Sequence, residues 1–132
     1  MKYRQRIYGD LIERHLGEYR QMAFVAGARQ VGKTTLCRQL GQVYVNWDNE
    51  SHRDLILAGP DAVAKQAGLE ELQERPPVIV FDEIHKYGRW KRFLKGFFDT
   101  YESRCRILVT GSSRLDVYQR GGDSLMGRYF NY

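Results

Sequence analysis

A glycine-bearing turn between a short apolar run and a helical segment constrains this chain more than any other feature. Residues 27–34 read Gly-Ala-Arg-Gln-Val-Gly-Lys-Thr, a complete match to the pattern G-x-x-x-x-G-K-[ST]. The preceding residues 22–26 are apolar without polar alternation, which predicts a strand buried on both faces. Residues 34–40 predict a helix that ends at Gly41. A strand, a glycine turn and a helix in this order are typical of a loop that wraps around phosphate groups.

The fixed positions of this loop have chemical reasons. Glycines admit backbone conformations closed to other residues, so successive N–H groups can face phosphate oxygens. The helix N-terminus adds unpaired donors and a favourable dipole. We expect Lys33 to reach the β- and γ-phosphates, the Thr34 hydroxyl to bind Mg²⁺ and Thr35 to touch the α-phosphate. The residues predicted to bind nucleotide are Gly27, Ala28, Arg29, Gln30, Val31, Gly32, Lys33, Thr34 and Thr35.

Two acidic residues follow the clearest strand pattern in the chain. The apolar run at residues 78–81 leads directly into Asp82 and Glu83. Because ligands of open parallel sheets bind at the carboxyl ends of the strands, both acids should face the same phosphates. We expect Asp82 to hold Mg²⁺ and Glu83 to orient or deprotonate an attacking water. Two solvated acids at a strand end are the alternative, which the nearby phosphate loop makes less favoured.

A further strand, expected at residues 106–110, ends in the hydroxyl-rich sequence Thr-Gly-Ser-Ser at residues 110–113. Its end should reach the same crevice, where a hydroxyl could contact the γ-phosphate or the attacking water. Ser112 is the favoured residue for this role and Thr110 the next. Glycine and serine also form ordinary turns, which is the alternative interpretation.

The rest of the chain alternates between helical and strand patterns. Apolar residues at three- and four-residue spacings predict helices over residues 4–16 and 90–101. A short apolar run at 44–47 predicts another strand, and residues 53–75 predict a helix in two pieces, broken near Gly59-Pro60 and Gly68. This alternation predicts one α/β domain over residues 1–132, with a parallel sheet and helices on both faces.

Composition limits the class of protein. The chain has 132 residues, of which 42% are hydrophobic, and this is enough to bury a core. No apolar stretch approaches the roughly 20 residues that cross a bilayer, and no signal peptide is evident. The two cysteines exclude a disulfide scaffold and a four-cysteine zinc site. We therefore expect a soluble, cytoplasmic protein without a membrane partner.

Charge is unevenly distributed along the sequence. Residues 43–85 carry three basic and nine acidic side chains, whereas residues 86–132 carry ten basic and four acidic ones. This asymmetry suggests a face that prefers anions, such as a nucleotide, a nucleic acid or an acidic partner. One basic cluster could line a DNA surface, although a solvated basic face is favoured: Lys86, Arg89, Lys91, Arg92 and Lys95, with Trp90 interleaved.

Five segments occur in an order that resembles a known family. They are the phosphate loop at 27–34, Tyr44 to Asp48, Phe81 to Lys86, Leu108 to Ser113 and the pair Gly127-Arg128. Together they resemble prokaryotic AAA-type P-loop ATPases, in which this module precedes a C-terminal domain resembling restriction-endonuclease-like folds. The resemblance covers essentially the whole chain.

The resemblance carries specific expectations. It implies a parallel sheet of order 5-1-4-3-2, with the acidic strand beside the phosphate-loop strand, and ATP hydrolysis with Mg²⁺. It implies Ser112 as the sensor of the γ-phosphate. It also implies that Arg128 contacts the γ-phosphate or a neighbouring subunit's nucleotide, and hence a possible homo-oligomer. For Arg128, an ordinary ion pair with a carboxylate is an equally favoured alternative.

The last residues set one more expectation. The family's fifth strand would begin near residues 129–132, where this sequence stops. We therefore expect a truncated ATPase module whose incomplete fifth strand leaves an edge of the phosphate-loop strand open, or a module that completes its sheet with another chain.

The predicted function is hydrolysis of ATP to ADP and phosphate, which drives or gates a protein or DNA partner. One alternative is a non-hydrolysing nucleotide- or DNA-binding interaction module. A P-loop kinase acting on a small molecule is less favoured, because Glu83 suits water activation and no arginine-rich lid is evident.

Overall fold

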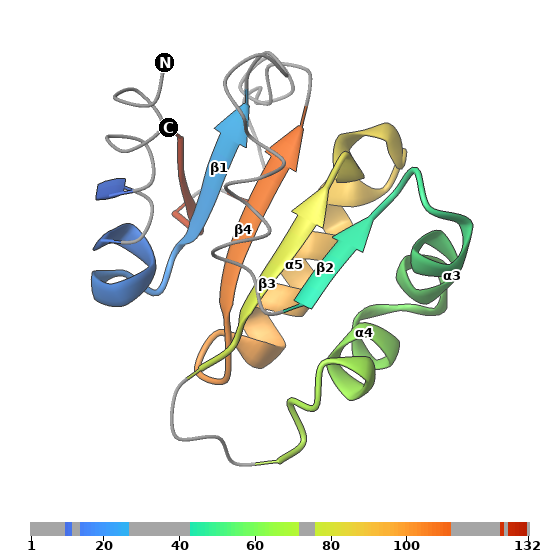
Figure 1. Cartoon of the computed structure of the whole chain (residues 1–132), viewed down its shortest axis with the longest axis horizontal. Coiled ribbons are helices and arrows are strands. Elements are labelled where there is room, and N and C mark those ends of the chain that lie inside the picture. The colour runs from blue at the N-terminus through green and yellow to red at the C-terminus, as the bar shows by residue number, and fades with distance from the viewer. Residues whose placement is uncertain are drawn as a thin grey trace.

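The computed structural model describes residues 10–11, 14–26, 43–71, 76–111, 125 and 127–131. Residues 27–35 of the predicted phosphate loop and Ser112 lie outside these ranges. The described elements are β1 (Met22–Ala26), β2 (Val43–Asn46), α3 (Glu50–Ala58), α4 (Pro60–Gln66), β3 (Val78–Asp82), the 3₁₀ helix η2 (Ile84–Lys86), α5 (Trp90–Tyr101), β4 (Arg106–Gly111) and β5 (Tyr129–Asn131) (Figure 1). Residues 14–18, before β1, are also helical.

The strands form one parallel sheet of order β2-β3-β4-β1-β5. Read from its other edge, this is the predicted order 5-1-4-3-2, and the predicted α/β class is confirmed. The expectation that the acidic strand lies beside the phosphate-loop strand is wrong, because β4 lies between β3, which carries Asp82, and β1. A parallel pair cannot be joined by a tight turn, and α3 and α4 between β2 and β3, and α5 between β3 and β4, pack on one face of the sheet.

The fifth strand forms over three residues. Tyr129, Phe130 and Asn131 pair in parallel register with Met22, Ala23 and Phe24 of β1. The sequence predicts an open edge here, but β5 covers β1 over its first three residues. Met22 N also donates to the carbonyl of Arg128 (2.8 Å), the residue directly before β5.

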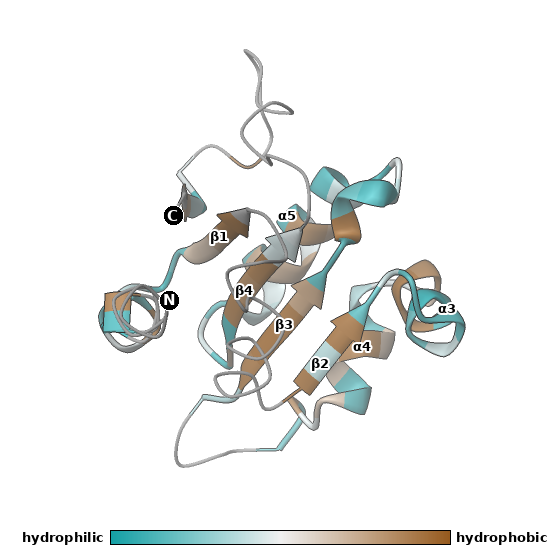
Figure 2. Cartoon of the chain, turned by 45° about the horizontal axis from the view of Figure 1, so that its top comes forward, coloured by the Kyte–Doolittle hydropathy of each residue, from teal (hydrophilic) through white to brown (hydrophobic). Residues whose placement is uncertain are grey.

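The larger core lies between one face of the sheet and α3, α4 and α5 (Figure 2). The apolar stripe predicted for residues 90–101 is confirmed, because its five large side chains are buried in α5. Phe81 of β3 makes edge contacts with Phe93 and Phe97 of this helix, at ring-centroid distances of 5.6 and 5.4 Å. The buried members of the stripe are Trp90, Phe93, Leu94, Phe97 and Phe98.

The helix predicted over 53–75 differs at both ends. It begins three residues earlier, because the Asn49 side chain caps α3 by accepting a hydrogen bond from His52 N (3.2 Å). The predicted break is confirmed at Gly59, whose φ of 111° suits glycine, and Pro60 then begins α4. The second piece ends at Gln66. No helix of the described segments is long and apolar enough to cross a membrane.

The opposite face of the sheet has its own smaller core. Leu16, Ala23, Val25, Val80 and Leu108 are buried there, with Tyr44 and Val78 packed against them. Because side chains alternate along a strand, Asp82 shares this face with Val80, and Thr110 shares it with Leu108. Asp82, at the carboxyl end of β3, therefore lies on the same face of the sheet as the smaller apolar core.

Candidate functional site

The strand register brings two of the expected site residues, Asp82 and Thr110, together at the carboxyl ends of their strands. Asn46 of β2 lies opposite Asp82 of β3, and Asp82 lies opposite Thr110 of β4. Thr110 in turn pairs with Val25, one residue before the end of β1. Gly27, the first residue of the predicted phosphate loop, follows directly after β1. The predicted loop therefore begins at the carboxyl ends of the strands, the same end of the sheet at which Asp82 lies.

The Asp82 carboxylate is held from both sides. Its side chain accepts a hydrogen bond from the Thr110 hydroxyl at Oδ1 (2.8 Å) and another from the Tyr44 hydroxyl at Oδ2. The residue is only 7% exposed. These donors fix the rotation of the carboxylate, and each oxygen keeps a lone pair for a further donor or a cation. The arrangement suits an oxygen ligand that must be oriented before its partner arrives.

The Thr110 hydroxyl contacts a protein side chain, and not the phosphate or water that its position at the strand end suggests. The sequence predicts a hydroxyl directed at phosphate or water, but the structure directs it at Asp82. The residue is fully buried, and its carbonyl accepts a hydrogen bond from Glu83 N (2.8 Å). Thr110 therefore positions both acids of the pair, through its side chain and its backbone.

Glu83 occupies a strained backbone position. Its φ of 58° and ψ of 21° lie in the left-handed region, and it is the one non-glycine residue with positive φ among those described. Such a conformation costs on the order of 1–3 kcal/mol and persists where surrounding contacts impose it. It turns the chain from β3 into η2 within one residue, and the Glu83 side chain stays 6–7% exposed at the end of the sheet.

Two basic groups lie beside the Glu83 carboxylate. His85 Nε2 and Lys86 Nζ are each 3.5 Å from Glu83 Oε2. Lys86 Nζ also donates to both oxygens of Asp48, each at 2.9 Å. This hydrogen bond to Asp48 raises the pKa of Lys86, so the amine remains charged. Lys86 thus connects the segment after β2 with the second acid of the pair.

Tyr44, Asp48 and Lys86 are contributors to the site that the sequence analysis did not identify. The spacing of Glu83 and Lys86 is three residues, a common separation for an ion pair, and could have indicated their contact. Asp48 and Tyr44 each lie 38 residues from their partner. No local pattern signals such a pair.

Arg128 lies at the other end of the strands. Its carbonyl accepts from the first residue of β1, whereas Asp82 lies level with the last residues of β1. The guanidinium donates to both carboxylate oxygens of Asp99 on α5, from Nε at 2.8 Å and from Nη2 at 3.1 Å. This bond lowers the pKa of Asp99. Of the two sequence-based interpretations, the structure shows the carboxylate ion pair, and it does not bring Arg128 together with Asp82.

The metal expected at Asp82 fits the donor set. Among the described residues, no group of three or more His, Cys, Asp and Glu side chains could hold a metal ion. Mg²⁺ in nucleotide sites typically uses one or two protein oxygens, with phosphates and water as its other ligands. A single oriented carboxylate is what such a site requires. The predicted second ligand, Thr34, lies outside the described residues.

These features define a class of protein. A parallel sheet of this order carries an acidic pair after β3, and the pattern G-x-x-x-x-G-K-T follows β1. That combination is the P-loop nucleotide-binding fold. Residues 19–132 match the family model described as AAA domain, so the chain belongs to the AAA domain family. It is therefore an AAA-type, nucleotide-binding ATPase module.

One solved structure supports the fold. The structure of Drosophila ORC bound to DNA is similar with a TM-score of 0.62 and 11% sequence identity, covering 98% of this chain and 89% of that chain. The structure of C. elegans PCH-2 is similar with a TM-score of 0.49 and 17% identity, covering 93% of this chain and 38% of that one. At these identities the first likeness shows the fold alone. No curated protein matches the sequence.

Proposed function

We propose that this chain binds ATP with Mg²⁺ through residues 27–34 and hydrolyses it to ADP and inorganic phosphate. The observation that carries this proposal is the placement of Asp82 and Glu83. Both are buried at the edge of the sheet where β1 leads into the G-x-x-x-x-G-K-T sequence. Buried carboxylates need compensating partners, which Tyr44 and Thr110 supply for Asp82 and Lys86 supplies for Glu83. The resulting oriented acidic pair lies close in strand register to the start of the G-x-x-x-x-G-K-T pattern, which supports the proposal.

Each residue has a proposed part in the reaction. Lys33 binds the β- and γ-phosphates, backbone N–H groups of residues 27–32 surround the phosphates, and Thr35 touches the α-phosphate. Thr34 and Asp82 hold Mg²⁺, which when bound neutralises charge on the phosphate oxygens. Tyr44 and Thr110 keep the Asp82 carboxylate turned toward that position.

Glu83 is the proposed base. It orients the attacking water and accepts its proton as the water oxygen bonds to the γ-phosphorus and the bond to ADP breaks. Ser112 is proposed to contact the γ-phosphate. Because Lys86 and His85 lie 3.5 Å from Glu83, they limit where its carboxylate can swing.

The wider setting of the module is also a proposal. The resemblance noted in the sequence favours a prokaryotic, cytoplasmic protein whose module continues into a C-terminal domain. Hydrolysis would then drive or gate a protein or DNA partner, in a homo-oligomer if Arg128 reaches a neighbouring nucleotide. The Asp99 pair must open for Arg128 to do so.

The deciding experiment measures ATP binding and phosphate release separately. We expect Lys33→Ala to lose ATP binding, and Glu83→Gln to keep binding while phosphate release falls at least a hundredfold. Chelation of Mg²⁺ should abolish release in the unaltered chain. ATP binding without hydrolysis, unaffected by Glu83→Gln, would favour the non-hydrolysing interaction module. Phosphate transfer to an added small molecule would favour the kinase.

A further inference from the structure

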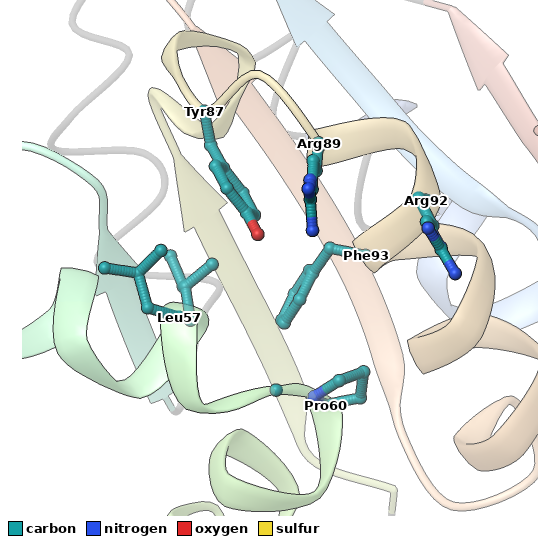
Figure 3. Close-up of a pocket in the computed structure, with 8 residues that line it drawn as sticks. Leu57, Pro60, Tyr87, Arg89, Arg92 and Phe93 are labelled. Carbon is teal, nitrogen blue, oxygen red and sulfur yellow. The ribbon is translucent and has the colours of Figure 1, made fainter.

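A pocket lies on the sheet face opposite the Asp82 carboxylate. Its volume is about 300 Å³, at the lower end of the range for ligand pockets. One wall comes from the end of α3 and the start of α4, and the other from the segment between η2 and α5 together with the first turn of α5 (Figure 3). Its lining residues are Ile56, Leu57, Gly59, Pro60, Tyr87, Arg89, Arg92 and Phe93.

The wall from α3 and α4 is apolar. Ile56, Leu57 and Pro60 line it without a charged side chain. Leu57 is 56% exposed, whereas leucines such as Leu94 and Leu108 are fully buried. Figure 3 shows Leu57 and Pro60 facing the side chains of Tyr87 and Phe93 across the pocket. A concave, exposed apolar surface of this kind favours an apolar group from a binding partner.

The facing wall is basic. Arg89 and Arg92 are both exposed, and among the described residues neither guanidinium forms a hydrogen bond or an ion pair. Figure 3 shows Arg89 pointing into the pocket near Tyr87 and Phe93, with Arg92 farther along α5 at the outer rim. Two guanidinium groups at one rim can bind a carboxylate with charge-assisted, bidentate hydrogen bonds.

The start of α5 makes this basic wall unfavourable without an anion. Arg89 is the N-cap residue, its side chain does not cap the helix, and the first turn has no acidic residue. The N-terminus of a helix carries partial positive charge, so arginine there is opposed by the dipole. A bound carboxylate would offset both charges. A local arrangement that breaks the usual preference without internal compensation is typical of a functional surface.

We propose that this pocket docks a short protein segment in which Asp or Glu stands beside a large apolar side chain. The apolar side chain fills the space between Leu57 and Phe93, and the carboxylate binds Arg89 and Arg92. This division between an apolar wall and a basic rim matches an amphipathic acidic peptide. The proposal does not rest on ATP hydrolysis, because the pocket and the Asp82 carboxylate lie on different faces of the sheet.

The surroundings favour a peptide over a nucleic acid. A nucleic acid repeats its phosphates along its length and would leave the apolar wall in water. The outer surface of α3 and α4 also carries three exposed acids, Glu50, Asp54 and Asp61. They would repel an extended polyanion but are compatible with one short acidic segment.

The test uses the full chain and defined probes. Fluorescently labelled 12-residue peptides carry Asp or Glu next to Leu, Phe or Trp, and their counterparts carry Asn or Gln. A single-stranded 20-nucleotide DNA is the third probe. We expect acidic peptides to bind at least tenfold more tightly than the amide counterparts. The double variant Arg89→Gln/Arg92→Gln and the variant Leu57→Ser should each weaken the acidic peptides about tenfold or more.

Lys95→Gln is the control, since it removes one positive charge from an exposed position of α5 outside the pocket, half of the charge that the double variant removes. It should leave peptide affinity within about twofold. Absence of peptide binding, or an equal loss with Lys95→Gln, would overturn the proposal. So would DNA binding that depends on Arg89 and Arg92 while the peptides do not bind. Circular dichroism of each variant separates loss of binding from loss of fold.

Discussion

The Thr110 hydroxyl on β4 donates a 2.8 Å hydrogen bond to the Asp82 carboxylate at the end of β3. With the Tyr44 hydroxyl on the other side, it makes the acid a fixed part of the sheet rather than a mobile surface group. Three adjacent strands therefore determine where one pair of oxygen atoms lies. The effect of removing either hydroxyl group on the position of Asp82 can therefore be predicted.

Removing the Thr110 hydroxyl should impair hydrolysis more than binding. Thr110→Val keeps the side-chain shape and leaves Asp82 with one donor fewer, so the carboxylate can rotate. We expect phosphate release to fall about ten- to a hundredfold and the Mg²⁺ concentration for half-maximal activity to rise. Thr110→Ser should retain most of the activity. Thr100→Val, at an exposed position of α5, is the control. Equal activity in Thr110→Val and the unaltered chain would show that the hydrogen bond has no part in catalysis.

Lys86 should matter through Glu83 and not through nucleotide affinity. Lys86→Met removes a charge that lies 3.5 Å from Glu83 and 2.9 Å from Asp48. We expect ATP affinity to change less than about twofold and phosphate release to fall about tenfold, because Glu83 loses a partner that restricts its position. Lys95→Met, on the exposed side of α5, should leave both quantities unchanged. A parallel loss of affinity in Lys86→Met would instead place Lys86 against the nucleotide.

Acid should destabilise the fold through His15. This side chain is buried, and its Nε2 lies 2.7 Å from the Gln21 carbonyl oxygen. Burial lowers the pKa of His15 below its ordinary value of 6.5 by more than this hydrogen bond raises it. The unfolded chain therefore binds a proton at a higher pH than the folded chain does. The contribution of neutral, buried His15 to the free energy of unfolding is fully present above about pH 6.5. It is lost as the pH falls from there through the lower pKa of His15 in the folded chain.

The measurement is the free energy of unfolding by urea at pH 7.5 and at pH 5.5. It should be smaller at pH 5.5 in the unaltered chain, and the difference should shrink in His15→Gln. His52→Gln is the control, because that histidine is only partly buried. An unchanged difference in His15→Gln would assign the acid sensitivity to other groups.

Replacing Arg128 should lower stability slightly and leave catalysis of the single chain intact. Arg128→Ala removes the two hydrogen bonds to Asp99, which connect the start of β5 with α5. The pair is partly exposed, so we expect a loss of about 0.5–1 kcal/mol in the free energy of unfolding. Asp99→Asn should produce a similar loss, and the two changes together should be less than additive. If Arg128→Ala abolished hydrolysis while stability stayed the same, the arginine would be acting on a nucleotide, in its own chain or a neighbour's.

Local patterns determined most of the architecture. The apolar run at residues 22–26 predicted a strand buried on both faces, the run at 78–81 predicted the strand β3, and the i, i+3, i+4 stripe from Trp90 to Tyr101 predicted α5. The Gly-Pro break between α3 and α4 could be predicted because glycine tolerates a φ of 111° and proline suits the first turn of a helix. Each of these signals acts over a few neighbouring residues. The order of the sheet is different in kind, since it followed from the family resemblance.

By itself, the sequence determined the elements, the phosphate-loop pattern and the acidic pair after β3. Only the tertiary structure decided which groups hold that pair. Tyr44 and Thr110 reach Asp82, Asp48 reaches Glu83 through Lys86, and Arg128 reaches Asp99 at the other end of the strands. The physical reason is that backbone periodicity is local, whereas strand register follows from the packing of whole faces. A hydrogen bond between residues 28 or 38 positions apart exists only once that packing has aligned their strands.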